Sequence, residues 1–186
     1  MLAVEYPGYG VYEDPEGSSE EKILRDAELV YNFILDVTKI AEEKILIMGR
    51  SLGSGPATHL AAKYNPGHLI LMSPLSSLKS VATSRVGFLS FLIAEKFNNL
   101  SKMHQVSCPT FIVHGQRDNI IPIEQAQQLK DRCFGPCTFL APALMTHNRW
   151  DIKEDLIVPL RIFLKQSPEE SSLIDLDSLN NSDFIN

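Results

Sequence analysis

The fold of this chain is decided by one stretch, Lys44-Ile45-Leu46-Ile47-Met48-Gly49-Arg50-Ser51-Leu52-Gly53-Ser54-Gly55. An aliphatic run, typical of a buried strand, breaks into Gly-x-Ser-x-Gly, and residues 56–62 after it have a helical composition. This order predicts a sharp strand-to-helix turn that lifts the Ser51 hydroxyl out of a sheet as a nucleophile. The glycines two residues to either side leave room for a strained turn. An ordinary strand-to-helix turn is the alternative that this stretch alone leaves open.

The rest of the chain alternates between short apolar runs and helical patterns, which predicts a mostly parallel, doubly wound α/β sheet of about five strands. We expect one domain over residues 1–166. Ser18 and Glu21 are spaced as a capping box before the first helix, whose apolar stripe is Ile23, Ala27, Val30, Ile34 and Val37. The expected strands are residues 2–6, 44–48, 69–72, 110–113 and 138–141. The expected helices are the one opened at Ser18, then 54–64, a region within 76–104, 124–133 and 153–165.

The amino-acid composition limits the class of protein and the kinds of partner. The 186 residues are 44% hydrophobic and 22% charged, as in a soluble globular protein. Residues 167–186 are predicted to form a disordered acidic tail. From residue 168 on there are five acids and no Lys or Arg, so this end carries −5 of the net −6 and the remainder only −1. A nearly neutral body argues against nucleic-acid binding.

The three cysteines, Cys108, Cys133 and Cys137, have no partners at metal-ligand spacing, so we expect free thiols and no metal. No organic cofactor is expected either. The start of the chain does not read as a signal peptide, and the most apolar segment, residues 86–94, is too short to span a bilayer. The sequence predicts a cytoplasmic protein.

Two further residues have the types and the order that a nucleophilic serine requires. Asp118 follows the apolar run at 110–113, and His147 follows the run at 138–141. Both are therefore predicted on loops after the carboxyl end of a strand, where catalytic groups gather in open α/β sheets. The order Ser, Asp, His fits an acyl-transfer triad. A turn aspartate and a surface histidine remain the alternatives, and His114 is expected to pack or to bond to backbone.

Together these motifs resemble the alpha/beta hydrolase family, and within it the alpha/beta-hydrolase-domain proteins that act as protein depalmitoylases. The resemblance covers about residues 1–165 and implies Ser51 as nucleophile, Asp118 as acid, His147 as base and the Leu52 N–H as an oxyanion donor. One departure is Thr146, where the family usually has glycine. The motifs are Tyr6-Pro7-Gly8-Tyr9-Gly10, Gly49-Arg50-Ser51-Leu52-Gly53-Ser54-Gly55, Ser73-Pro74-Leu75, His114-Gly115-Gln116-Arg117-Asp118 and His147-Asn148.

The resemblance also implies that residues 2–6 are the family's fourth strand, so that the sheet is N-terminally truncated. The strand between residues 2–6 and residues 44–48 would then be lacking, and so would the loop that supplies a second oxyanion donor. Loss of one such donor costs about 10²–10³ in rate. We therefore expect the chain alone to be weakly active or inactive.

Residues 75–107 lie where the family inserts a short helical cap. The apolar residues 86–94 within it are expected either to contact an acyl chain or a membrane surface, or to pack in the core. The order of Ser51, Asp118 and His147 thus predicts a serine hydrolase, and the resemblance implies acyl esters or thioesters as substrates, with protein S-depalmitoylation as the leading reaction. Its partner would be an acylated protein or a lipid ester. The alternatives are a lipid esterase or serine peptidase, a non-catalytic binding module, or an interaction protein that uses the acidic tail.

Overall fold

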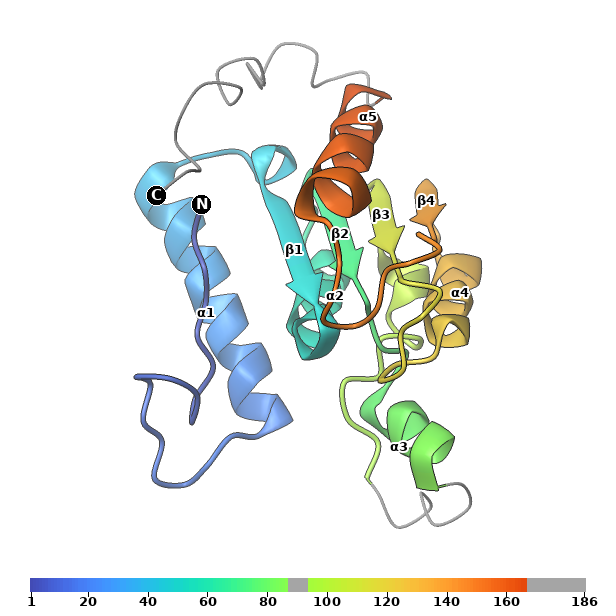
Figure 1. Cartoon of the computed structure of the whole chain (residues 1–186). Helices are drawn as coiled ribbons and strands as arrows, with labels where there is room; N and C mark the ends of the chain where they lie inside the picture. Colours follow the sequence, from blue (N-terminus) through green and yellow to red (C-terminus); the bar gives the residue numbers. More distant parts are fainter. Residues whose placement is uncertain (87–93, 167–186) are drawn as a thin grey trace, which may run out of the picture. The chain divides into compact units, whose positions relative to one another are not determined.

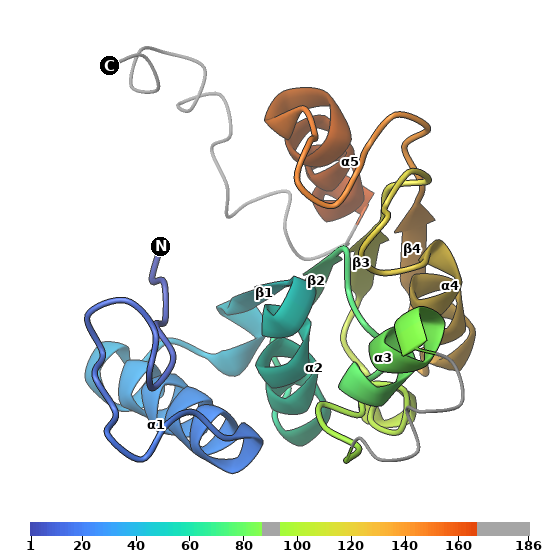
Figure 2. The ribbon, with the colours of Figure 1, turned by 60° about the horizontal axis from the view of Figure 1, so that its bottom comes forward.

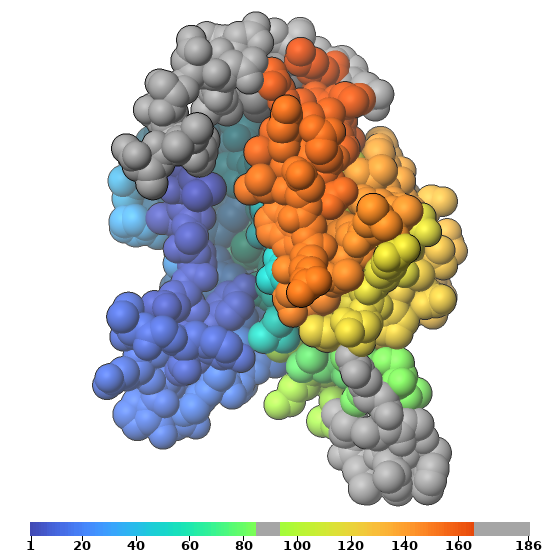
Figure 3. All heavy atoms as spheres, in the orientation of Figure 1, coloured from blue at the N-terminus to red at the C-terminus, as the bar shows by residue number. Residues whose placement is uncertain are grey.

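The computed structural model describes residues 1–86 and 94–166. The apolar residues 87–93 and the predicted tail 167–186 lie outside the described residues, so the expectations placed on them stay predictions. The chain divides into two compact units, Met1–Trp150 and a second that begins at Asp151. Figure 1 and Figure 3 show the whole chain, and each unit is described below by itself.

The first unit is built on a sheet of four parallel strands in the order β1-β2-β3-β4 (Figure 1). Every residue of β2 and β3 is buried, which confirms that the two continuous apolar runs form central strands. β1 alternates between exposed and buried residues, and within the described residues it pairs with β2 alone. The strands are β1 (Leu46–Arg50), β2 (His68–Met72), β3 (Thr110–Val113) and β4 (Cys137–Leu140).

Helices connect the strands of this unit (Figure 2). α2 follows β1 after one short turn and packs on β1 and β2, while α1 packs against α2 and α4 against β4. The helices are α1 (Glu20–Thr38), α2 (Ser54–Lys63), α3 (Leu78–Val86) and α4 (Ile123–Arg132), with short 3₁₀ turns η1 (Glu42–Lys44), η2 (Ser51–Gly53) and η4 (Met103–Gln105). Residues 94–102 are not helical, so the described part of the expected region 76–104 is not one continuous helix.

The N-terminal expectation of a strand over residues 2–6 is wrong, and the sheet has four strands where about five were expected. A strand is stabilised by a ladder with a neighbour, and no described strand lies alongside this segment. Leu2 and Val4 are exposed, and Figure 3 shows the N-terminal residues on the surface. The turn that follows is present, because Gly8 and Gly10 have φ values of +79° and +52°, which favour glycine.

α1 begins one residue later than the capping box predicted. The Ser19 hydroxyl, not that of Ser18, accepts the Lys22 N–H at 3.2 Å. Ile23 and Ala27 of the predicted stripe are buried, but Val37 is 63% exposed. The helix is held instead by Tyr31, whose ring centroid lies 4.5 Å from that of Tyr64 at the end of α2.

Two apolar clusters fill the first unit. The larger lies among α1, α2 and the sheet and includes Ile47, Leu69, Leu71 and Ile112. The smaller consists of Ile23, Leu75, Phe97 and Ile121, with half-buried Leu52, Tyr6, Leu24, Leu78 and Val81 packed against it. Through the smaller cluster, α1 and residues from both sides of the gap at 87–93 pack next to Leu52, which follows Ser51.

The second unit consists of a π-helical turn η5 (Ile152–Ile157) that continues into α5 (Val158–Gln166). The Asp151 carboxylate caps it by accepting the N–H groups of Lys153 and Glu154. Pro159 lacks an N–H, so the regular α-helical hydrogen bond to the residue four places earlier cannot form there. The expected helix 153–165 is π-helical in its first turn, where the Val158 N–H donates to the Lys153 carbonyl five residues earlier.

In residues 1–86 and 94–166 all three thiols are free, and no cluster of side chains is suited to hold a metal ion. None of the helices in that part of the chain has the length and apolarity needed to cross a bilayer.

Candidate active site

Ser51 lies on the turn between β1 and α2 with a left-handed backbone, φ +52°. Such a φ is uncommon for a residue other than glycine and marks a strained turn. A Cβ at Gly49 would lie 2.4 Å from the Gly53 carbonyl oxygen and 2.6 Å from the Ala57 side chain, so only glycine fits there. A Cβ at Gly53 would meet only the Tyr6 hydroxyl, at 3.1 Å. The two glycines of the motif are therefore unequally constrained.

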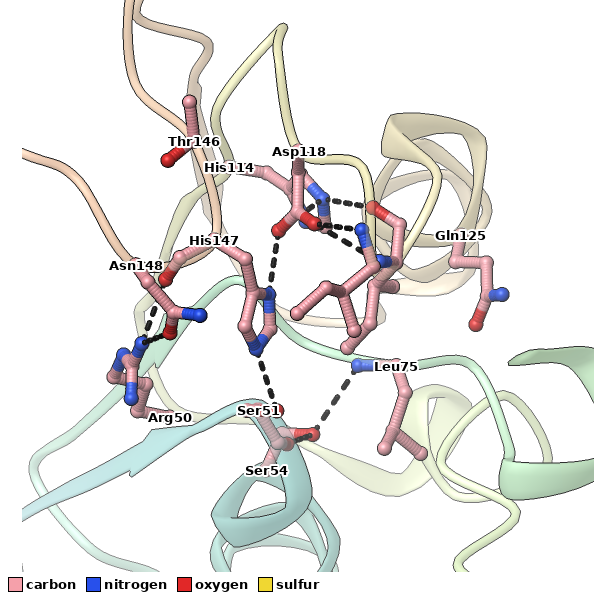
Figure 4. A network of polar contacts seen from close by, with 12 residues as sticks. Arg50, Ser51, Ser54, Leu75, His114, Asp118, Gln125, Thr146, His147 and Asn148 are labelled. Atoms are coloured by element: carbon pink, nitrogen blue, oxygen red, sulfur yellow. Dashed lines mark hydrogen bonds and ion pairs between the residues drawn. The ribbon is translucent and has the colours of Figure 1, made fainter. Parts of the chain in front are cut away.

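A buried hydroxyl supports this turn from below (Figure 4). Ser54 Oγ donates to the Ser51 carbonyl at 2.6 Å and accepts from the Leu75 N–H at 3.3 Å and from Asn99 Nδ2 at 3.1 Å. Ser54 and Asn99 are completely buried. Sequence reasoning missed this support, because the contacts join residues 21 and 45 positions apart in the chain. The small polar residue three places after Ser51 was its only signal.

Asp118 lies on the loop after β3, as predicted. One carboxylate oxygen accepts the N–H groups of Ile120 at 2.8 Å and Ile121 at 2.9 Å, and the other lies 2.7 Å from His147 Nδ1. Burial by itself would raise the pKa of Asp118, but the hydrogen bonds from Ile121, His147 and Ile120 together hold that pKa below its usual value. The carboxylate is therefore charged and fully buried, and acts as an acceptor only.

His147 lies on the loop after β4 and completes a chain of hydrogen bonds (Figure 4). Its Nδ1 lies 2.7 Å from Asp118 and its Nε2 lies 3.0 Å from Ser51 Oγ. Because the ionised carboxylate can only accept, Nδ1 carries the proton and Nε2 is free to accept from the Ser51 hydroxyl. The structure thus brings the three predicted residues together, from positions 96 and 29 apart in sequence.

Thr146, the departure from the resembled family, fits its loop. Its N–H donates to the Arg149 carbonyl at 2.8 Å, and its hydroxyl accepts the Arg149 N–H at 2.9 Å. These bonds close a tight turn with His147 and Asn148 at its tip. The turn packs on Gly115, where a Cβ would lie 2.1 Å from the Met145 carbonyl oxygen. The threonine hydroxyl thus provides a cap that glycine would lack.

His114, the competing histidine, bonds to backbone as expected. It is fully buried, and Nε2 donates to the Ile121 carbonyl at 2.9 Å, with Asp118 at 3.5 Å from the same nitrogen. Burial lowers the pKa of His114, so the ring is neutral. His114 therefore braces the loop of Asp118 and does not face Ser51.

The backbone N–H of Leu52, the predicted oxyanion donor, follows Ser51 in η2 and has no hydrogen-bond acceptor among the described residues. A free N–H beside a nucleophile can receive a developing negative charge. The arrangement of Ser51, His147 and Asp118 permits a proton to pass from the serine hydroxyl to the imidazole while the carboxylate fixes the tautomer.

No protein-family model matches the chain, but individual proteins do. It is 27% identical over 166 residues to human alpha/beta hydrolase domain-containing protein 17B, covering 89% of this chain and 56% of that protein. It is 28% identical over 133 residues to alpha/beta hydrolase domain-containing protein aho-3 of Caenorhabditis elegans, covering 72% and 39%. A putative alpha/beta hydrolase of Acanthamoeba polyphaga mimivirus is 31% identical over 132 residues, covering 70% and 49%. The chain spans about half the length of these curated relatives.

Solved structures show the same fold. An esterase of Pyrococcus furiosus superposes with a TM-score of 0.69 at 19% identity, covering 87% of this chain and 68% of the esterase. An acylaminoacyl peptidase of Pyrococcus horikoshii superposes with a TM-score of 0.62 at 18% identity, covering 86% and 30%. The chain therefore has the alpha/beta hydrolase fold and is related in sequence to the alpha/beta hydrolase domain-containing proteins.

Proposed function

We propose that this chain carries the catalytic centre of a serine hydrolase that cleaves acyl esters or thioesters. The observation that carries the proposal is the hydrogen-bonded chain from Ser51 Oγ through His147 to Asp118, with distances of 3.0 and 2.7 Å. Catalytic hydrogen bonds of this length connect a nucleophile, a base and the group that orients the base. The relatedness to alpha/beta hydrolases supports the same reaction class.

The proposed reaction has two steps, acylation of Ser51 and hydrolysis of the acyl-serine. Ser51 Oγ attacks the acyl carbon while its proton moves to His147 Nε2, and the Leu52 N–H stabilises the oxyanion. His147 then protonates the departing alcohol or thiol, which leaves an acyl-serine. Water then attacks this ester while giving a proton to His147 Nε2. As the bond between the acyl carbon and Ser51 Oγ breaks, His147 returns that proton to Ser51 Oγ, which releases the carboxylic acid and regenerates the free serine and the neutral imidazole.

Protein S-depalmitoylation is the specific reaction that we propose. It is supported by the resemblance to the depalmitoylase branch and by half-buried Leu52, which packs against the buried apolar cluster beside the turn. The cluster itself is buried, but the exposed part of Leu52 places apolar surface beside the oxyanion donor, which suits a long acyl chain. Three free thiols fit a reducing compartment such as the cytoplasm, where acylated proteins would be the partners.

Labelling with a fluorophosphonate probe tests the chemistry. Covalent labelling requires an activated serine but not efficient turnover, so even a weakly active chain should form an adduct at Ser51, mapped by peptide mass spectrometry. We expect Ser51→Ala and His147→Ala to abolish it. A palmitoyl thioester should compete for labelling better than an acetyl thioester. If circular dichroism shows that the chain is folded and no adduct forms, the alternative of a non-catalytic binding module would be favoured. Equal competition by the acetyl and the palmitoyl thioester would contradict the depalmitoylase assignment but not the serine hydrolase assignment.

A further inference from the structure

Arg50 connects the nucleophile strand to the loop of the base. It is the last residue of β1 and precedes Ser51 directly. Its guanidinium Nη2 donates to the His147 carbonyl oxygen at 2.6 Å and to Asn148 Oδ1 at 3.0 Å (Figure 4). The two acceptors lie 97 and 98 positions further along the chain. One side chain thus spans between the two residues that must exchange a proton.

The loop that carries His147 is otherwise held from the other side. Gln116 donates its backbone N–H to Pro142 at 3.1 Å and its side-chain amide to Ala141 at 2.8 Å, and the Arg117 N–H donates to Met145 at 3.1 Å. These bonds all tie the loop to the segment that carries Asp118. They hold His147 close to Asp118. They do not set the distance from His147 to Ser51, because none of them involves β1 or Ser51.

Within the described residues, apart from the bond between His147 and Ser51, the hydrogen bonds between this turn and β1 are those of Arg50. A guanidinium is well suited to such a tie, because it is planar and always charged, and its donors have a fixed geometry. A charge-assisted bond to a carbonyl is also shorter and stronger than a neutral one. The turn that carries His147 and the turn that carries Ser51 are therefore coupled through Arg50, whose side-chain hydrogen bonds among the described residues go to the His147 carbonyl and to Asn148 and not to the imidazole or the Ser51 hydroxyl.

We propose that Arg50 is a positioning residue, which sets the distance between His147 Nε2 and Ser51 Oγ by clamping the backbone of the His147 turn to the end of β1. This inference rests on the proposed function of the same site. It separates two tasks in the loop: Asp118 fixes the tautomer of the ring, and Arg50 fixes its approach to the nucleophile.

The test compares Arg50→Ala and Arg50→Lys with Arg149→Ala. Arg149 lies in the same turn, is exposed and contributes only backbone bonds, so its replacement removes one positive charge near His147 but leaves the clamp. The measured quantity is fluorophosphonate labelling, resolved into the binding constant and the maximal rate. We expect Arg50→Ala to lower the maximal rate about 10- to 100-fold with little change in the binding constant. Arg50→Lys should recover part of the loss, and Arg149→Ala should stay near wild type.

Two readouts separate positioning from a general loss of structure. Methylguanidinium, below denaturing concentrations, should restore labelling of Arg50→Ala but not of His147→Ala. The far-downfield proton resonance of His147 Nδ1 should persist in Arg50→Ala, since its bond to Asp118 is made on the other side. A wild-type labelling rate in Arg50→Ala, or an equal loss in Arg149→Ala, would overturn the clamp.

The proposed function and the clamp fail differently. If the wild-type chain gives no adduct at Ser51, the hydrolase proposal fails. The clamp is then judged by titrating the His147 ring in wild type, Arg50→Ala and Arg149→Ala by NMR. If the chemical shifts of the His147 ring are the same in Arg50→Ala as in wild type, the clamp is rejected. If these chemical shifts change in Arg50→Ala but not in Arg149→Ala, the clamp is supported.

Discussion

The Ser54 hydroxyl donates a 2.6 Å hydrogen bond to the carbonyl of Ser51, so the turn that carries Ser51 is held by a side chain in the first turn of α2. The same hydroxyl accepts two N–H donors, from Leu75 and Asn99. It therefore connects the nucleophile turn, the chain after β2 and the segment before η4 at one buried point.

Ser54→Ala should leave the buried Leu75 N–H without its acceptor and the Asn99 amide with only its bond to the Leu75 carbonyl. We expect it to lower the free energy of unfolding by about 1–3 kcal/mol and to slow labelling of Ser51. Urea denaturation and fluorophosphonate kinetics measure the two effects. Ser101→Ala is the matched control, because the exposed Ser101 hydroxyl bonds only to the nearby Asn98 carbonyl, and its loss should cost at most about 0.5 kcal/mol. Equal stability losses in both variants would contradict the role given to Ser54.

The two motif glycines should differ sharply when each is changed to alanine. Gly49→Ala places a methyl group against backbone at 2.4 Å, and we expect a loss of about 3 kcal/mol or more, or no folding. Gly53→Ala meets only the Tyr6 hydroxyl at 3.1 Å and has an ordinary helical backbone, so it should fold with a change of at most about 1 kcal/mol. Thermal unfolding checks both. Adding Tyr6→Phe should relieve any cost of Gly53→Ala, and a cost that persists would show that the hydroxyl is not its cause.

The charge of Asp118 should make stability depend on pH in a defined window. Its pKa in the folded chain is below the ordinary value of 3.8, so its contribution is fully present above that value and is lost as the pH falls through the lowered pKa. We expect Asp118→Asn to be less stable than wild type by about 1–3 kcal/mol at neutral pH. The difference should shrink as the pH falls below 3.8. Urea titrations of both proteins across this range measure it, and a difference that grows on acidification would reverse the sign.

Cys108 should report on unfolding. Burial raises the pKa of this thiol to about 11, so at pH 8 roughly one thiol in a thousand is a thiolate. We expect iodoacetamide to modify Cys108 only as the chain unfolds in urea. Tryptic cleavage after Lys102, Arg117, Arg132 and Arg149 separates Cys108 from the pair Cys133 and Cys137, so its modification can be followed alone. Rapid alkylation of Cys108 in native buffer would contradict its burial.

The three site residues could be predicted because each follows an apolar run that becomes a parallel strand. The carboxyl ends of parallel strands meet at one edge, so Ser51, Asp118 and His147 converge once the strand order is known. Arg50 and Ser54 could not be assigned in this way. Their partners lie up to 98 positions away, and no local pattern encodes such contacts.

The errors have local causes as well. Ser18 and Ser19 are both suitable helix caps, and the spacing to Glu21 favours Ser18, but the extended backbone at Ser19 and its bond from the Lys22 N–H place the cap one residue later. Residues 2–6 have the composition of a strand, but a strand requires a neighbour, which composition does not reveal. The stripe on α1 was extended to Val37 by periodicity, although the packing partner α2 ends near Tyr64.

Because each strand of the sheet pairs with the strand before it in the chain, a ribosome releases this sheet in the order of its assembly. β1 and its serine leave the exit tunnel first, β3 and the carboxylate follow, and the imidazole comes last. Ser51 is therefore synthesised before the two residues that complete its hydrogen-bonded chain. Because the base lies after β4, the complete hydrogen-bonded chain from Ser51 to Asp118 requires all four strands of the sheet.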